Sequence, residues 1–434
     1  MKKGKIDFIT MGCSKNLVDS EKVMALLEGR GWHCVHDGRR IDGEVVVVNT
    51  CGFIEDAKRE SIDMILELAA LKRQGKIGRL VVMGCLSQRY MSELKAELPE
   101  VDMFFGKFDF NKLADYVGTA YGSLGKVGVE RLLTTPRHYA YLKVSEGCDR
   151  HCTYCAIPLI TGRQRSRTME DIVEEARRLV EGGARELIII AQDLTAYGTD
   201  LYGEQRIAEL VERLADVKGT DWIRLHYGYP TEFPWELTRV MNERENVCKY
   251  MDVALQHVSD GVLKRMGRRM GKEETYEFVD RLREEVPGIS LRTTLMVGFP
   301  GETEEDFEEL MEFTRWARFE RMGAFAYSEE EGTYAANNYA DDVTAAEKGR
   351  RMDRLMELQE GIAEELGMAS VGKREQVVVD GKEGDFYVCR TSQSSPDVDP
   401  VILVNAGGRG LRRGSVHSVE ITDTEGVDLL GKLV

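Results

Sequence analysis

A short loop with three closely spaced cysteines constrains this chain more than any other feature. The segment Gly147–Cys155 reads Gly-Cys-Asp-Arg-His-Cys-Thr-Tyr-Cys, which places three and then two residues between Cys148, Cys152 and Cys155. In a chain without a secretory signal, such a cluster is more typical of a metal or catalytic site than of a disulfide framework. A zinc site needs a fourth ligand, and none follows at the usual spacing, although His151 lies inside the loop. An iron–sulfur cluster held by three cysteines would leave one iron open to a ligand.

Length and charge narrow the class of protein. The 434 residues are enough for roughly two to four domains. No apolar run is long enough to span a membrane, and Met1–Asp7 lacks the apolar core of a signal peptide. We therefore expect the nine cysteines to be reduced thiols of a cytoplasmic protein. The net charge of −16 makes nucleic acid an unlikely partner and favours a basic protein.

Residues 1–120 alternate apolar runs with amphipathic helical patterns, which predicts a doubly wound α/β domain with a parallel sheet. Strands are expected at 5–10, 44–49 and 79–83. Cys13, Cys51 and Cys85 each follow one of these strands, and each has a glycine neighbour. Because ligands of open α/β sheets bind beyond the carboxyl ends of the strands, the three thiols are able to meet there and hold a second cluster. Taken singly, each cysteine is more often an inert buried residue; taken together, the three indicate a cluster.

A linker is expected at 118–136, and a second α/β region follows over residues 134–366. Its strands are predicted at 139–144, 187–191, 222–226, 250–255, 289–297 and 321–328. Six β/α units predict a partial (β/α)6 barrel with its active residues at the C-terminal ends of the strands. The cysteine loop follows the first of these strands.

The pattern changes again over residues 370–434, after a long charged helix at 345–366. Short strands at 376–379, 385–390, 400–405 and 416–421 are separated by Gly and Asp, which predicts a small antiparallel β-barrel. From Val371 to Val434 there are eight Lys or Arg and ten Asp or Glu, a net charge of −2 (8 − 10). A barrel that grips RNA is expected to be basic instead.

The cysteine loop, with Tyr154 directly before its third cysteine, resembles the signature loop of radical S-adenosylmethionine (SAM) enzymes. The dispersed upstream cysteines and the segment Val48–Ile54 resemble the methylthiotransferases of that superfamily, and the final barrel resembles their TRAM domain. The resemblance covers almost the whole chain and implies two [4Fe–4S] clusters. The implied ligands of the cluster that cleaves SAM are Cys148, Cys152 and Cys155. The implied ligands of the auxiliary cluster are Cys13, Cys51 and Cys85.

The resemblance also implies a reaction. A radical made from SAM takes a hydrogen from the substrate carbon, the auxiliary cluster presents sulfur, a second SAM supplies the methyl group, and an unidentified donor supplies electrons. The residues implied to line the SAM pocket are Tyr154, Gln192, Asp193, Gln256 and Arg292. Arg292 would hold the SAM carboxylate and Gln192 or Asp193 the ribose, whereas capping or structural hydrogen bonding is the alternative for each.

Two segments, Ala57–Ser61 and the acidic Thr391–Asp399, resemble the branch of the family that acts on a ribosomal protein. That branch methylthiolates the β-carbon of an aspartate in small-subunit ribosomal protein S-twelve, and the acidic segment would dock this basic protein. The alternative is the sister branch, which modifies adenosine in tRNA. The segment Ala191–Asp193 (Gly-Gln-Asn in that branch), the acidic final barrel and the acidic segment argue against it. A non-catalytic metal-binding adaptor is a third possibility, which anaerobic SAM cleavage would exclude.

Overall fold

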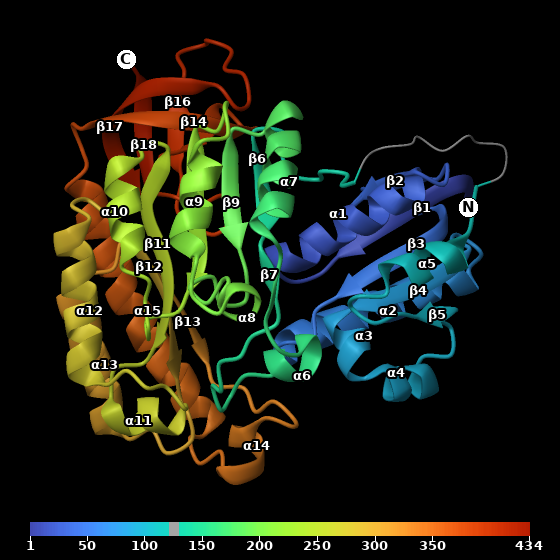
Figure 1. Ribbon diagram of the computed structural model, residues 1–434, viewed down its shortest axis with the longest axis horizontal. Coiled ribbons are helices and arrows are strands. Elements are labelled where there is room, and N and C mark those ends of the chain that lie inside the picture. Colours follow the sequence, from blue (N-terminus) through green and yellow to red (C-terminus); the bar gives the residue numbers. More distant parts are fainter. Residues whose placement is uncertain (121–129) are drawn as a thin grey trace.

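The structure is a computed structural model that describes residues 1–120 and 130–434. It contains two open parallel sheets and one closed barrel, in chain order (Figure 1). The predicted linker at 118–136 lies partly outside the described residues. Within the described ranges, none of the helices combines the length and apolarity that crossing a bilayer requires.

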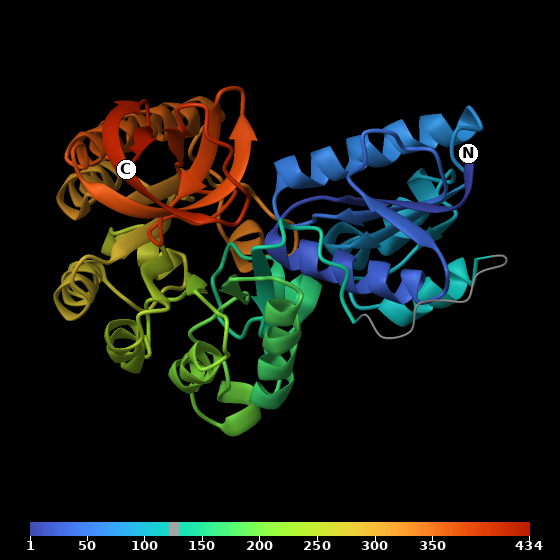
Figure 2. The ribbon, with the colours of Figure 1, turned by 90° about the horizontal axis from the view of Figure 1, so that it is seen from above.

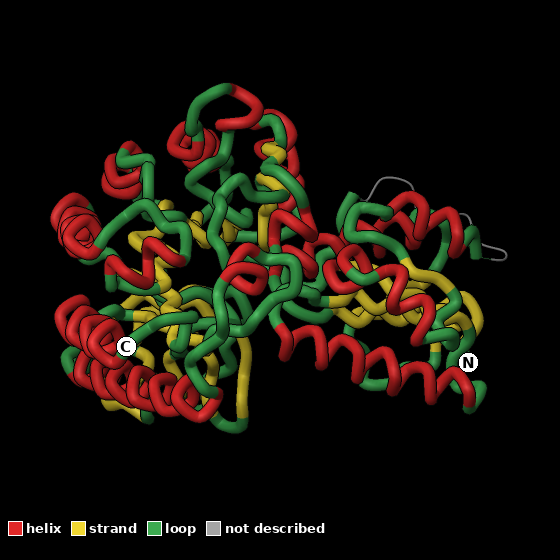
Figure 3. Tube along the Cα trace, turned by 90° about the horizontal axis from the view of Figure 1, so that it is seen from below, coloured by secondary structure: helices red, strands yellow, loops and turns green. Residues whose placement is uncertain are grey.

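The N-terminal sheet has five parallel strands in the order β2-β1-β3-β4-β5, with helices on both of its faces (Figure 3). In the central strand β3, Val45 and Val47 pack in one apolar cluster and Val46 and Val48 in another, since successive side chains of a strand point to opposite faces. The doubly wound prediction is confirmed, although β2 and β5 were not predicted. The elements are β1 (Lys2–Thr10), α1 (Ser14–Glu28), β2 (His33–His36), β3 (Gly43–Thr50), α2 (Glu55–Arg73), β4 (Arg79–Gly84), α3 (Cys85–Arg89), α4 (Met91–Glu97), β5 (Met103–Phe104) and α5 (Phe110–Val117).

The second sheet has six parallel strands in the order β13-β12-β11-β10-β9-β6, which confirms the partial barrel. Figure 2 shows its open curve, with helices along the outer side. Its strands are β6 (Tyr139–Lys143), β9 (Glu186–Ile190), β10 (Trp222–Gly228), β11 (Val247–Gln256), β12 (Ser290–Val297) and β13 (Arg321–Ala326). Its helices are α7 (Met169–Glu181), α8 (Thr199–Tyr202), α9 (Ile207–Ala215), α10 (Glu236–Glu243), α11 (Asp260–Arg265), α12 (Lys272–Glu285), α13 (Glu304–Ala317), α14 (Tyr334–Asn338) and α15 (Ala345–Met368).

The last part of the chain forms a closed barrel in the order β14-β15-β16-β18-β17. Its strands are β14 (Arg374–Glu383), β15 (Phe386–Arg390), β16 (Ile402–Asn405), β17 (Val416–Glu425) and β18 (Asp428–Leu433). The barrel is not wholly antiparallel as expected, because β16 and β18 run parallel. The reason is β18, which was not predicted: it pairs with both β17 and β16 and so closes the barrel.

The acidic loop between β15 and β16 enters the partial barrel, whose N-terminal strand ends face the closed barrel (Figure 1). Asp397 accepts hydrogen bonds from the hydroxyls of Tyr139 at 3.1 Å and Tyr141 at 3.4 Å. Asp399 accepts one from the hydroxyl of Tyr250 at 2.8 Å, and its side chain is 1% exposed. The side chain of Asp399 is therefore not available to dock a basic protein, whereas Asp397 is exposed and its docking role stays a prediction.

Ion pairs fix the N-terminal part against the partial barrel. Asp19 of α1 pairs with Lys143 of β6. Glu21, about two turns from the start of α1, lies 2.6 Å from Arg131, which also reaches Glu175 of α7 at 3.0 Å. All of these side chains are at most 10% exposed. Helix α1 is therefore anchored to the barrel and packs against its first strand, β6.

Candidate functional site

The predicted cysteine loop lies between β7 (Ser145–Glu146) and α6 (Ile157–Thr161), directly after β6. The backbone N–H of Arg150 donates to Sγ of Cys148 at 3.4 Å, and the hydroxyl of Tyr229 lies 3.7 Å from Sγ of Cys152. Burial raises the pKa of Cys148 to about 12. Such a thiol stays protonated at neutral pH unless a metal ion takes the place of the proton.

The three dispersed cysteines lie together at the C-terminal ends of β1, β3 and β4, as predicted. A Cβ on Gly12, the residue before Cys13, would lie 2.8 Å from Cβ of Cys51. Asn16 connects the loops of Cys51 and Cys85. Its side-chain amide donates to the carbonyl of Thr50, the residue before Cys51, at 3.1 Å, and its Oδ1 lies 3.4 Å from Sγ of Cys85. Cys13, Cys51 and Cys85, which are far apart in sequence, thus form one group of thiols, the dispersed set.

The substitution Gly12→Ala is expected to disrupt this set. Gly12 has a φ of +87°, and an added methyl group would overlap Cys51. We expect the iron content of the reconstituted protein to fall from about eight to about four atoms per chain, with SAM cleavage retained. Gly75→Ala is the matched control, because Gly75 has a φ of +69° but open space around its Cβ position. A full iron content in the Gly12 variant would contradict the assignment.

Positive charge lies beside the dispersed set, which the sequence did not indicate. Desolvation by the surrounding protein opposes the ionisation of Cys13, but Lys15 and Lys107 hold the pKa of its thiol below the usual value. Lys107 is fixed at 2.5 Å from Asp19, and both side chains are at most 2% exposed. Burial raises the pKa of Cys51, and that of Cys85 to about 12, so within this set only the Cys13 thiol is shifted toward the thiolate.

The two cysteine sets line one region of the molecule. Cys85 packs in a small buried cluster with Ala156, the residue after Cys155, and with Ile160 of α6. Helix α3, which begins at Cys85, therefore contacts the helix that follows the cysteine loop. Neither contact could be foreseen, since each joins two different sheets.

Gln192 and Gln256, two of the predicted pocket residues, present acceptors that no group satisfies. Gln192 lies just after β9, and Gln256 ends β11 with a φ of +72°. In the described part of the chain, the Oε1 atoms of both side chains are buried without a hydrogen-bond partner. Because a buried unpaired polar atom costs about 1–3 kcal/mol, these atoms are suited to receive donors from a ligand.

Asp193 and Tyr154 make contacts that hold the cysteine loop. Asp193 accepts a hydrogen bond from Nε of Arg150, a loop residue, at 2.7 Å and another from the hydroxyl of Thr195 at 2.6 Å. The ring of Tyr154 packs edge-on against Phe299, with 6.4 Å between the ring centroids. That these two residues line the SAM pocket stays a prediction, and Asp193 already has partners within the protein.

Arg292 does not lie with the other predicted pocket residues. It is near the start of β12, on the side of the closed barrel, and its guanidinium lies 3.5 Å from Asp252 and 3.2 Å from Asp399. The expectation that it holds the SAM carboxylate is therefore corrected: Arg292 is neutralised by two carboxylates and links the barrel to the acidic loop. The strand was predicted, but the position of Arg292 along it was misjudged.

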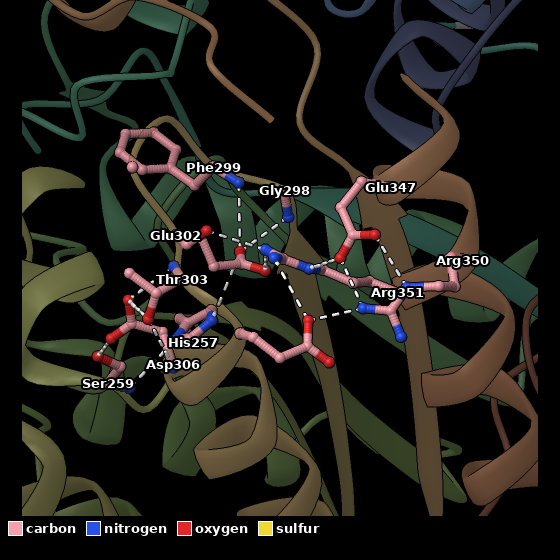
Figure 4. A network of polar contacts seen from close by, with 12 residues as sticks. His257, Ser259, Gly298, Phe299, Glu302, Thr303, Asp306, Glu347, Arg350 and Arg351 are labelled. Atoms are coloured by element: carbon pink, nitrogen blue, oxygen red, sulfur yellow. Dashed lines mark hydrogen bonds and ion pairs between the residues drawn. The ribbon is translucent and has the colours of Figure 1, made fainter. Parts of the chain in front are cut away.

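The turn after β12 is held by a buried carboxylate network, which Figure 4 shows. Glu302 accepts hydrogen bonds from the backbone N–H groups of Gly298 at 2.7 Å and Phe299 at 3.2 Å. Arg351 of α15 lies 2.7 Å from the same carboxylate. Burial lowers the pKa of the neighbouring His257 to about 3, so this imidazole is neutral at pH 7. The network shapes the turn, and its role is structural.

Replacing Glu302 by alanine is expected to destabilise the protein by about 3 kcal/mol, because it leaves the N–H groups of Gly298 and Phe299 without their acceptor and removes one of the buried carboxylates that pair with Arg351, which keeps Glu347 at 2.7 Å. The measurement is the midpoint of thermal unfolding. Glu308→Ala, which removes an exposed partner of the partly exposed Arg354, is the control and should shift the midpoint little. Equal shifts in the two variants would contradict the structural role of Glu302.

The donor sets fit the groups that the resemblance implied. Among the described residues, no three side chains of His, Cys, Asp or Glu converge on one point as a single metal ion requires. A [4Fe–4S] cluster does not need this, since each cysteine binds a different iron. Two sets of three thiols, with unpartnered glutamine acceptors nearby, therefore fit two clusters and a polar ligand better than a zinc ion.

Comparison with known proteins assigns the chain to a protein family. Family models match residues 5–106 (Uncharacterized protein family UPF0004), 142–314 (Radical SAM superfamily) and 371–434 (TRAM domain). Proteins named ribosomal protein uS12 methylthiotransferase RimO are similar over the whole chain. The one from Phocaeicola vulgatus is 57% identical over 100% of both chains, and the one from Cytophaga hutchinsonii is 45% identical over 100% of this chain and 98% of its own.

Among solved structures, the radical SAM methyltransferase TsrM from Kitasatospora setae is similar, with a TM-score of 0.54. Its sequence is 14% identical, and the match covers 77% of this chain and 74% of that chain. At this identity the likeness concerns the fold alone, and it agrees with the α/β architecture described above. The relatives that match from end to end decide the family: this chain belongs to the RimO family of radical SAM methylthiotransferases.

Proposed function

We propose that this protein transfers a methylthio group to the β-carbon of an aspartate of ribosomal protein uS12. The observation that carries the proposal is the contact between the two cysteine sets through Cys85 and Ala156. A carbon radical must meet its sulfur source before it is quenched, so the two reactive centres have to share one protected space. The uS12 in the names of the full-length relatives supports the choice of substrate.

In this proposal each thiol set holds one [4Fe–4S] cluster. When bound, these groups and SAM supply hydrogen abstraction, sulfur and the methyl group. The SAM cluster is assigned to Cys148, Cys152 and Cys155, and the auxiliary cluster to Cys13, Cys51 and Cys85. Gln192 and Gln256 accept hydrogen bonds from SAM, Tyr154 and Asp193 hold the cysteine loop in place, and Arg292 is no longer among the SAM-binding residues.

We assign these roles to three domains, at residues 1–120, 134–366 and 370–434. The separate sheets support this division. An electron donor of unidentified nature reduces the clusters, and the reaction takes place in the cytoplasm, where thiols stay reduced.

The tRNA alternative has no specific observation in its favour. The acidic loop is a weaker argument against it than its sequence suggests, because Asp399 is buried inside the chain and only Asp397 is exposed. The acidic charge of the final barrel and the Ala191–Asp193 segment still favour a protein substrate.

The deciding experiment offers both substrates in parallel. The anaerobically reconstituted protein is incubated with SAM and a reductant, together with uS12 or unmodified tRNA, and the products are identified by mass spectrometry. A methylthio adduct on an aspartate of uS12 is the expected result. An adduct on tRNA alone would overturn the proposal.

A further inference from the structure

Lys15 lies at the junction of the two cysteine sets, and among the described residues no carboxylate forms an ion pair with it, although the charge of the buried Asp252 of β11 interacts with it from further away. It is in the first turn of α1, two residues after Cys13, and is partly exposed. Its Nζ lies 3.2 Å from the centroid of the Tyr227 ring, at the end of β10. Within residues 1–120 and 130–434, no carboxylate oxygen lies within 4.0 Å of this ammonium group.

Lys107 and Lys143, the two deeply buried lysines of this region, are neutralised. Asp19 forms ion pairs with both Lys107 and Lys143, and all three side chains are at most 3% exposed. Those two lysines therefore serve the structure and are not available to a ligand. Lys15 is held only by the face of an aromatic ring, an attraction that is weak at a partly exposed site. A carboxylate arriving at Lys15 would form a stronger, charge-assisted contact.

The surroundings of Lys15 place it where the substrate has to be. The ring beneath it, Tyr227, belongs to the partial barrel, and Tyr229, two residues further on, lies beside Cys152. The backbone of Tyr227 has a φ of +66°, a conformation that residues other than glycine rarely adopt. Val18, one turn along α1, is buried against residues of β6 and β9. The C-terminal end of β10 and the residue after it therefore contact both Lys15, through Tyr227, and the cysteine loop, through Tyr229.

We propose that Lys15 binds the carboxylate of the substrate's acidic side chain and so selects an aspartate. The inference rests on the proposed function. In an aspartate side chain the β-carbon is bonded directly to the carboxyl carbon. Holding the carboxylate at Lys15 therefore fixes the position of the reacting carbon between the two cysteine sets. The pairing also explains why this cation is left without a partner inside the protein.

The test compares two uS12 peptides that differ in one residue, one with the target aspartate and one with asparagine in its place. Their affinities for the reconstituted protein are measured by fluorescence anisotropy, and the readout is the ratio of the two. Wild type is expected to prefer the aspartate peptide, and Lys15→Met to lose about tenfold or more of that preference. Lys15→Arg keeps the charge and is expected to retain most of it. Lys112→Met is the matched control, since Lys112 is 76% exposed and pairs within its own helix region with Asp109.

Because Lys15 also influences Cys13, iron content and SAM cleavage without peptide are measured for each variant. Should Lys15→Met lose its auxiliary cluster, Tyr227→Ala is the second probe. It removes the ring that positions the ammonium group, contacts no cysteine ligand and should reduce the preference several-fold. An unchanged aspartate preference in the variant that keeps both clusters would overturn the inference.

Two further outcomes separate the inference from the proposed function. A higher KM for SAM in peptide-free cleavage by Lys15→Met, with peptide preference unchanged, would mean that Lys15 binds the SAM carboxylate, and would overturn the inference alone. If wild type modifies no uS12 at all, the proposed function fails. If wild type modifies uS12 and Lys15→Met does so with the same aspartate preference, only the role of Lys15 fails.

Discussion

Replacing Cys51 by alanine is expected to abolish methylthio transfer while SAM cleavage continues. The backbone of Cys51 is held by Ser61, whose hydroxyl bonds both its N–H and its carbonyl at 3.1 Å. The loop should therefore keep its shape when the thiol is lost. Only the dispersed set loses a ligand, and the set at Cys148 stays complete. The product on uS12 should fall by at least a thousandfold, as expected when a group essential to the chemistry is removed.

The measurement pairs two assays on the same sample, 5′-deoxyadenosine by chromatography and modified uS12 by mass spectrometry. Cys34→Ala is the matched control, since Cys34 is buried in the apolar cluster between the sheet and α1, outside both sets. It should keep both activities and lose only a small amount of stability. Loss of SAM cleavage in Cys51→Ala alone would contradict the division of roles between the two sets.

The cysteines could be placed from the sequence because strand ends are predictable. Cys13, Cys51 and Cys85 each follow an apolar run beside a glycine, and the carboxyl ends of neighbouring parallel strands meet at one edge. Sheet order was not needed for this inference. The cysteine loop could be predicted without any knowledge of the fold, because its three thiols lie within one short segment.

Contacts between side chains far apart in the sequence could not be predicted. Arg292 was assigned to a ligand because it occurs in a barrel strand, yet the two carboxylates that neutralise it come from β11 and from the acidic loop. The same loop was predicted to be a docking surface because it is acidic. The sequence does not show that tyrosine hydroxyls of the chain donate hydrogen bonds to its carboxylates. Lys15 and Lys107 were not among the predicted site residues, since the sequence does not show which lysines form ion pairs.

Replacing Glu186 by alanine is expected to have the largest effect on stability, about 3–5 kcal/mol. Glu186 opens β9 and is 2% exposed. Its carboxylate lies 2.7 Å from Nε of Arg224 and 2.5 Å from Nη2 of Arg390, which belongs to the closed barrel. Both guanidinium groups are at most 1% exposed, so the substitution leaves two buried cations without their shared partner. We expect a lower unfolding midpoint and faster proteolysis between the partial and the closed barrel.

The matched control is Glu420→Ala, which removes the partner of the half-exposed Lys432 and should cost about 1 kcal/mol or less. The acid limb of stability gives a second test. Burial opposes the ionisation of Glu186, but Arg390 and Arg224 hold its pKa below the usual value. Its contribution is therefore present above the unfolded-state pKa of about 4.3 and is lost as the pH falls below it. Glu186→Gln should flatten this fall. If it leaves the acid limb unchanged and Glu186→Ala unfolds like the control, the closed barrel is held by the tyrosine–aspartate contacts of the acidic loop instead.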